Sequence, residues 1–143
     1  MQVKLKKLDD RAILPTRGSS MAAGLDLYAL EGVTVKAGET VLVHTGIALA
    51  IPDGYAGFIY ARSGIATKRG LAPANKVGVI DADYRGEIMV ALHNHSTEAQ
   101  EVDAGERVAQ LVVAPFLPVE LSVVETLDET ARAAGGFGST GKN

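Results

Sequence analysis

Turn-forming residues recur at short intervals along this chain, and they limit its regular elements to a few residues each. Glycine is frequent, with 16 residues, and the stretch Pro52–Gly54 adds a further turn signal. The segments between the turns are rich in β-branched residues or alternate apolar and polar side chains, which is typical of strands. We predict strands at residues 3–5, 33–35, 41–43, 58–60, 87–92 and 107–113. Many short strands separated by turns indicate an all-β fold, either an antiparallel sandwich or a barrel.

Helical patterns are scarce. Ser63–Arg69 predicts a short helix with Ser63 as its N-cap, and Leu127–Arg132 predicts a weak helix that glycines soon end. At 143 residues the chain suits a single domain, and its 47% of hydrophobic residues exclude disorder throughout. We expect a barrel core over residues 1–127 and a flexible C-terminal tail over residues 128–143, because the last stretch is small, polar and glycine-rich.

Composition excludes several classes of function. The formal net charge of −3 lacks the basic excess that is typical of a nucleic-acid-binding protein. The absence of cysteine excludes a disulfide scaffold and a thiolate metal site. Met1–Lys7 alternates apolar and basic residues without a long apolar core, so we expect neither a secretory signal nor a membrane partner. The expected compartment is the cytoplasm.

The tail contains a misleading motif. Gly136–Lys142 has the spacing of a nucleotide-binding P-loop, but Asn143 stands where that loop needs Ser or Thr, so we reject this interpretation. Glycine backbone and the hydroxyls of Ser139 and Thr140 can still donate hydrogen bonds to phosphate oxygens. Phe137 is a lone aromatic among these glycines, and a tail that only frays has no reason to carry it.

Polar residues that suit a nucleotide recur in five separate segments. These segments span residues 22–29, 61–66, 75–86, 105–111 and 132–141. In this order they resemble the five motifs of the trimeric dUTPase family, and they cover nearly the whole chain. The resemblance implies a distorted antiparallel β-barrel of jelly-roll type that forms a homotrimer, with active sites shared between subunits. It also implies Mg²⁺-dependent hydrolysis of dUTP to dUMP and pyrophosphate, which limits uracil in DNA and supplies dUMP for dTMP synthesis.

The third motif carries the residues that the resemblance assigns to the nucleoside. Asn75 offers an amide donor and a carbonyl acceptor, which match the O4 and N3–H of uracil and mismatch cytosine. Tyr84 would pack under the deoxyribose and leave no room for a 2′-hydroxyl. The backbone and side chains that complete this slot would come from Gly78, Val79, Ile80 and Met89.

Asp81 is the expected general base. A carboxylate one water molecule away from the α-phosphorus can orient that water and accept its proton. Asp83 competes for this role, and spacing alone does not decide between the two carboxylates. The resemblance assigns the role to Asp81, which lies six residues after Asn75.

The remaining motifs are assigned to the phosphates and the metal. Asp26 would place the magnesium ion through a bound water, since Mg²⁺ keeps several waters and prefers phosphate ligands. Arg132 would reach the γ-phosphate, and Phe137 would stack on the uracil. The other expected substrate contacts are Arg62, Ser63, Gly64, Gln110, Gly138, Ser139 and Thr140. Two positions depart from the family pattern: Ala61 replaces a usual proline, and Ala133 replaces a usual glycine.

Two alternatives stay open at this point. A dCTP deaminase shares the fold and the Arg–Ser pair, but those relatives carry a glutamate ten residues after the aspartate, where this chain has Ala91. A catalytically dead relative would bind only a nucleotide or a protein partner, but the presence of Asp81 and Arg132 disfavours it. The histidines at positions 44, 93 and 95 form no persuasive metal set and are expected at the surface.

Overall fold

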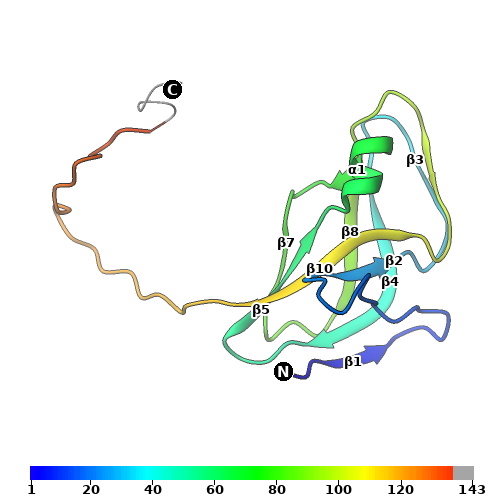
Figure 1. Cartoon of the computed structure of the whole chain (residues 1–143), viewed down its shortest axis with the longest axis horizontal. Helices are drawn as coiled ribbons and strands as arrows, with labels where there is room; N and C mark the ends of the chain where they lie inside the picture. Colours follow the sequence, from blue (N-terminus) through cyan, green and yellow to red (C-terminus); the bar gives the residue numbers. More distant parts are fainter. Residues whose placement is uncertain (137–143) are drawn as a thin grey trace.

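The computed structural model describes residues 1–136, and these residues form a small β-barrel followed by an extended arm (Figure 1). The strands are β1 (Lys4–Lys7), β2 (Leu25–Tyr28), β3 (Val33–Val35), β4 (Thr40–Ala50), β5 (Tyr55–Tyr60), β6 (Leu71–Pro73), β7 (Gly78–Ile80), β8 (Glu87–Asn94), β9 (Gln100–Val102) and β10 (Arg107–Pro115). The one helix of the described residues, α1, covers Ser63–Arg69. Within the described chain, no helix is long and apolar enough to cross a membrane.

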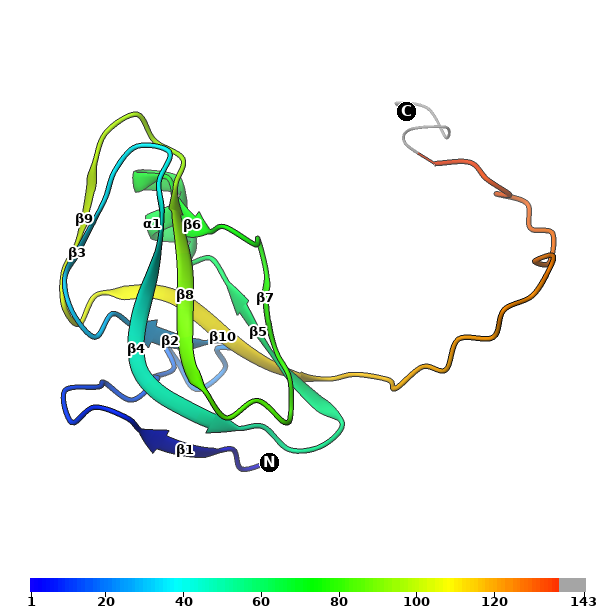
Figure 2. The ribbon, with the colours of Figure 1, turned by 180° about the vertical axis from the view of Figure 1, so that it is seen from behind.

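Two four-stranded antiparallel sheets face each other. One has the strand order β1-β4-β8-β6 and the other the order β2-β10-β5-β7, while β3 and β9 form a separate two-stranded ribbon. Strands that are neighbours in a sheet come from distant parts of the chain, as in the pairing of β10 with β2. Figure 2 shows the long strands β4 and β8 side by side across the barrel from β10. This arrangement confirms the predicted all-β fold of jelly-roll type.

The core is built by period-two alternation. In β8, Ile88, Val90 and Leu92 are buried, whereas the residues between them are only half-buried. The inward side chains of β8 meet those of β10, including Val108 and Leu111. The outward side chains of β8 are therefore free to line a surface cavity on the opposite face of the sheet.

A bulge interrupts the pairing of β4 with β8. His44 pairs with Met89 and Ala48 pairs with Glu87, so residues 45–47 stand opposite Ile88 alone. Gly46 in the bulge has a φ of 69°, and a Cβ there would lie 2.9 Å from the Cβ of Ala12. The bulge thus needs glycine for both its backbone conformation and its packing.

Each expected strand overlaps an observed one, and the helix at Ser63–Arg69 has the expected bounds. The bounds of several strands differ: β1 covers Lys4–Lys7 instead of residues 3–5, and β4 and β5 extend well beyond residues 41–43 and 58–60. The weak helix over Leu127–Arg132 is wrong, because that stretch holds only turn hydrogen bonds such as Ala133 N–H to the Thr130 carbonyl. The short strands β2, β6, β7 and β9 were not predicted, because they have three or four residues each and lack the unbroken β-branched run that marks β3.

An extended arm follows β10. Residues 116–134 are exposed and run away from the barrel (Figure 1). Their apolar side chains are among the most exposed of the molecule, with Leu121 at 92% and Val123 at 99%. The packed part of the described chain therefore ends at Pro115, and the division of the chain at 127 into core and tail stays a prediction.

Candidate functional site

A first cavity, which we call the turn cavity, lies on the outer face of β8 and holds most of the third motif. Its volume is about 230 Å³. Its floor is formed by the outward residues Met89 and Ala91 of β8 together with Leu42 of β4. Its other lining residues are Asn75, Val79, Ile80, Asp81, Tyr84 and Glu87. An apolar floor under polar walls suits the ring of a nucleobase and its sugar.

Local backbone geometry holds Asn75 against strand β7. Lys76 has a φ of 64°, and the Val77 N–H donates to the Asn75 carbonyl over 2.7 Å, so the chain turns sharply after Asn75. Gly78 then passes close to the Asn75 side chain, since a Cβ at Gly78 would lie 3.4 Å from Nδ2. The amide of Asn75 thereby faces the backbone of β7, where base-edge donors and acceptors are needed.

The turn between β7 and β8 orders the two candidate carboxylates. The Tyr84 N–H donates to the Asp81 carbonyl over 3.2 Å, which closes the turn. Asp81 lines the turn cavity, whereas Asp83 is not among its lining residues. The structure thus gives the choice between them a geometric basis, and the catalytic role of Asp81 stays a prediction.

A second cavity of about 240 Å³, the arginine cavity, gathers residues of the other motifs. It lies where β2, β10 and the start of α1 meet. Its lining residues are Gly18, Ala22, Gly24, Asp26, Arg62, Ser63, Gly64, Arg107 and Gln110. Two guanidinium groups and the free N–H groups of a helix start make this cavity suitable for an anion.

Asp26 orders the two arginines of this cavity. Its Oδ1 accepts a hydrogen bond from Arg62 Nε over 2.7 Å, and its Oδ2 accepts one from Arg107 Nη1 over 3.2 Å. The side chains of Asp26 and Arg62 are 14% and 23% exposed, so this ion pair is mostly shielded from water. Arg107 was not predicted as a site residue, because an arginine after a turn at the start of a strand has no distinctive sequence signal.

Gln110 fixes the segment that leads into α1. Its Nε2 donates to the Ala61 carbonyl over 2.9 Å. Its Oε1 lies against Gly24, where a Cβ would come within 2.5 Å of it. Gln110 is therefore at the predicted cavity, and the partner that its amide needs is supplied by the residue before Arg62.

The start of α1 differs in one detail from the prediction. Ser63 is the first helical residue, and Arg62 occupies the N-cap position with φ −89° and ψ 129°. No side chain caps the helix there, so the expected cap at Ser63 is wrong. The Ser63 hydroxyl remains exposed at the cavity, next to backbone N–H groups that lack helical acceptors.

The arginine cavity offers few ligands of its own to a metal ion. Among residues 1–136, no three His, Asp or Glu side chains come together as metal ligands. Asp26 contributes the single carboxylate among the lining residues, and both its oxygens already accept hydrogen bonds. These residues fit a magnesium ion that is held mainly by phosphate oxygens and water, with Asp26 outside its first shell.

Other predicted site residues lie apart from both cavities or outside the residues that the structure describes. Arg132 is exposed in the arm, where its Nε donates to the Gly135 carbonyl over 3.0 Å. Phe137, Gly138, Ser139 and Thr140 lie outside the described residues. The predicted site is thus divided, because the turn cavity and the arginine cavity share no lining residue.

This chain matches known proteins along nearly its whole length. The family model described as dUTPase matches residues 10–141. The deoxyuridine 5′-triphosphate nucleotidohydrolase of Nautilia profundicola is 50% identical over 142 residues, covering 99% of this chain and 100% of the relative. That of Yarrowia lipolytica is 48% identical over 145 residues, covering 100% and 91%.

Solved structures show the same architecture. A dUTPase of Staphylococcus bacteriophage 80alpha with dUpNHpp has a TM-score of 0.93 at 28% identity, covering 99% of both chains. A dUTPase of phage phi11 of S. aureus, in which a structural Mg(II) ion is coordinated, has a TM-score of 0.82 at 26% identity. It covers 88% of this chain and 98% of its own.

Proposed function

Because this chain belongs to the dUTPase family, we propose that it hydrolyses dUTP to dUMP and pyrophosphate at a site built from its two polar cavities. This reaction limits uracil in DNA and supplies dUMP for dTMP synthesis. The observation that carries the proposal is that the two cavities offer complementary chemical groups. One offers an amide, a phenol and a carboxylate on an apolar floor, and the other offers paired arginines to an anion.

Uracil and deoxyribose occupy the turn cavity in this proposal. The Asn75 amide and the β7 backbone pair with the uracil edge, while Tyr84 packs against the sugar. Cytosine reverses the donor and acceptor pattern of uracil and would leave buried polar groups unpaired. A ribose would bring a 2′-hydroxyl against the Tyr84 ring.

Asp81 activates the water. Its carboxylate orients a water molecule toward the α-phosphorus and accepts a proton from it as the new P–O bond forms. Pyrophosphate leaves in line with the attack. This role is supported by the position of Asp81 at the cavity that also holds Asn75 and Tyr84.

The phosphate chain lies in the arginine cavity. Arg62, Ser63 and Gly64 donate to its oxygens, and Gln110 keeps the preceding backbone in place. Members of this family depend on a divalent metal, and Mg²⁺ would neutralise the charge of the leaving pyrophosphate. Asp26 would hold one of the waters of that ion. Arg132, Phe137 and the residues 138–140 would close over the substrate from the tail.

The active enzyme is a homotrimer, with each site shared between subunits. This proposal is supported by the two cavities, which carry complementary parts of one site and have no lining residue in common. It is also supported by the arm, because Leu117, Val119, Leu121 and Val123 alternate as in a strand and are exposed.

In this proposal, the arm of a second protomer docks beside β1 on the barrel. β1 is the edge strand of its sheet, so one row of its backbone groups is free to pair. An apolar groove of about 490 Å³ runs beside it, and its lining includes Val3, Leu5, Leu14, Pro15, Leu25, Leu49, Leu111 and Val113. The exposed Lys4 and Lys6 of β1 would lie on the same side as Glu120 of the arm, opposite the face that carries the apolar side chains of both strands.

A nucleotide panel tests the proposed substrate. Pyrophosphate release is measured with dUTP, dTTP, dCTP and UTP in the presence of magnesium. We expect dUTP to be preferred by at least roughly 10- to 100-fold, which corresponds to one or two unpaired polar groups in the wrong complexes. Equal turnover of dCTP would contradict the recognition of uracil by Asn75. Equal turnover of UTP would contradict the exclusion of ribose by Tyr84.

Subunit mixing tests whether the site is shared. Asp81→Asn is expected to be nearly inactive and Arg62→Ala to retain roughly 1–10% of the wild-type kcat/KM. The two variants are mixed after unfolding and refolded together. If the two residues act from different subunits, about a quarter of the sites in random trimers regain both residues and activity returns. No recovery, with trimers verified by light scattering, would mean that both residues act within one chain.

A further inference from the structure

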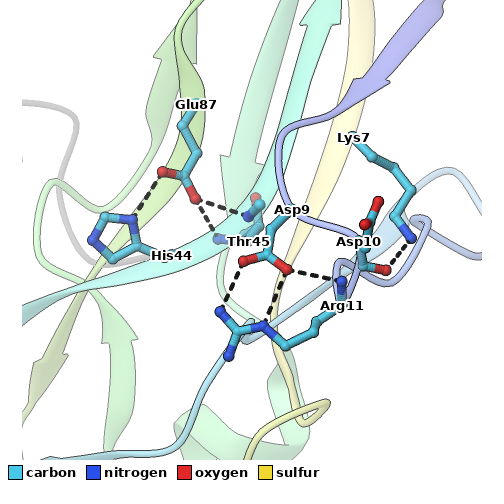
Figure 3. A network of polar contacts seen from close by, with 8 residues as sticks. Lys7, Asp9, Asp10, Arg11, His44, Thr45 and Glu87 are labelled. Carbon is cyan, nitrogen blue, oxygen red and sulfur yellow. Dashed lines mark hydrogen bonds and ion pairs between the residues drawn. The ribbon is translucent and has the colours of Figure 1, made fainter.

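One side chain holds the start of β8, and it was not predicted as a site residue. Glu87 Oε1 accepts hydrogen bonds from the backbone N–H of Gly46 over 2.8 Å and of Thr45 over 3.2 Å. Glu87 Oε2 accepts a hydrogen bond from His44 Nδ1 over 2.8 Å. Figure 3 shows this carboxylate between His44 and the backbone of Thr45. Three donors from β4 thus meet on one carboxylate of β8.

These donors come from the bulge of β4. Residues 45–47 have a single residue of β8 opposite them, so the regular ladder leaves N–H groups of the bulge unpaired. Glu87 accepts two of them, and the Thr45 hydroxyl donates to the Ile88 carbonyl over 2.5 Å. Because Thr45 and Gly46 are buried, removal of the carboxylate would leave these N–H groups without a hydrogen-bond acceptor.

The backbone of the same glutamate forms a hydrogen bond with the Tyr84 side chain. The Tyr84 hydroxyl donates to the Glu87 carbonyl over 3.0 Å. The ring lies directly over Gly86, where a Cβ would come within 2.4 Å of the hydroxyl oxygen. The position of the ring is therefore set by the backbone of Gly86 and Glu87, and the side chain of Glu87 anchors that backbone to β4.

The carboxylate is well suited to act as an anchor. Its side chain is only 22% exposed, and that of His44 is 47% exposed. Burial raises the pKa of Glu87, but hydrogen bonds from His44 and from the N–H groups of Gly46 and Thr45 together lower it below its ordinary value. Glu87 thus stays ionised, and its three hydrogen bonds are retained, throughout the neutral range.

We propose that Glu87, braced by His44, is a positioning residue that fixes the Tyr84 ring and thereby sets the selectivity for deoxyribose over ribose. This inference rests on the proposed function, in which the Tyr84 ring excludes the 2′-hydroxyl. Glu87 itself lines the turn cavity but acts through the ring. A loosened anchor lets the ring withdraw, so UTP gains access while the contacts of dUTP change less.

The test compares kcat/KM for dUTP and for UTP in wild type and in variants. Glu87→Ala is expected to lower the ratio of the two values about tenfold, as a small misplacement of a positioning group does. Glu87→Gln keeps a side-chain oxygen for the two backbone N–H groups, and its ratio is expected to stay within about twofold of wild type.

Asp9→Ala is the matched control. Asp9 is also a carboxylate that accepts hydrogen bonds from backbone and side chain, from Arg11 N over 2.8 Å and Arg11 Nε over 3.0 Å, but it lines neither cavity (Figure 3). Its ratio is expected to equal that of wild type. If Glu87→Ala is not recovered folded, His44→Ala decides, because the half-exposed histidine can be removed without opening the core; we expect a fall of about threefold.

The outcomes separate this inference from the proposed function. A wild-type enzyme that does not hydrolyse dUTP contradicts the proposed function itself. A selective wild-type enzyme whose ratio is unchanged in Glu87→Ala, or in His44→Ala if only that variant folds, contradicts the anchor alone. An equal loss of selectivity in Asp9→Ala also contradicts it, since general destabilisation would then explain the effect.

Discussion

Replacing Asp81 by Asn is expected to lower kcat for dUTP hydrolysis about 10²- to 10⁴-fold, the usual contribution of a general base. The amide has nearly the same shape as the carboxylate but does not accept the proton of the attacking water. Because the contacts of Asn75 and Tyr84 with the nucleoside are unaffected, affinity for a non-hydrolysable dUTP analogue is expected to change little. Pyrophosphate release gives kcat, and calorimetry with the analogue gives the dissociation constant.

Asp83→Asn is the matched control for this prediction. It makes the same chemical change in the same turn, at a residue that is not among those lining the turn cavity. Its activity is expected to stay within about twofold of wild type, since no proton transfer depends on it. If Asp83→Asn were the variant that lost activity, the assignment of the general base would have to move to that residue.

Arg62→Ala is expected to lower kcat/KM for dUTP about 10- to 100-fold, which corresponds to the loss of one charge-assisted hydrogen bond to phosphate. It should also lower the melting temperature, because Asp26 loses its shorter and more deeply shielded partner. Steady-state kinetics at saturating magnesium and thermal unfolding measure the two effects.

Arg107→Ala provides the comparison within the same ion-pair network. Arg107 lies 3.2 Å from Asp26, and its side chain is 50% exposed, so water can replace much of what it contributes. Both effects are expected to be clearly smaller than for Arg62→Ala. Equal effects of the two variants would show that the arginines act as one unit. The shielding of Arg62 from water would then contribute nothing to kcat/KM or to the melting temperature.

Much of the fold could be predicted from the sequence because its longer strands carry strict alternation. Residues 87–92 alternate between half-buried and buried positions, and this period identifies a strand with one face on the core. The three-residue strands β7 and β9 offer no such period, and only pairing with β5 and β3 defines them. The failed helix at residues 127–132 lacks a packing surface on the described barrel, and local propensity alone is too weak to form one.

The candidate site residues were predicted from their resemblance to the motifs of the dUTPase family, and the structure groups most of them in two cavities. Asn75, Asp81 and Tyr84 meet in one cavity, and Asp26, Arg62 and Gln110 meet in another. The positioning contacts were not predictable in the same way. Glu87 reads as an ordinary polar residue at the start of a strand, and its partners on β4 lie more than forty positions away. Only the bulge brings them together, and the bulge has no local sequence signature apart from Gly46.

The arm after Pro115 bears on the order in which the molecule is made. It follows the last strand of the barrel, so during translation the barrel sequence leaves the ribosome first and can close its core before the arm emerges. The uncovered leucine and valine side chains of residues 117–127 are then presented by a finished barrel rather than by a nascent chain. In the proposed trimer, these side chains are covered only when protomers associate, so newly made protein at very low concentration should stay aggregation-prone for longer than at high concentration, where association is faster.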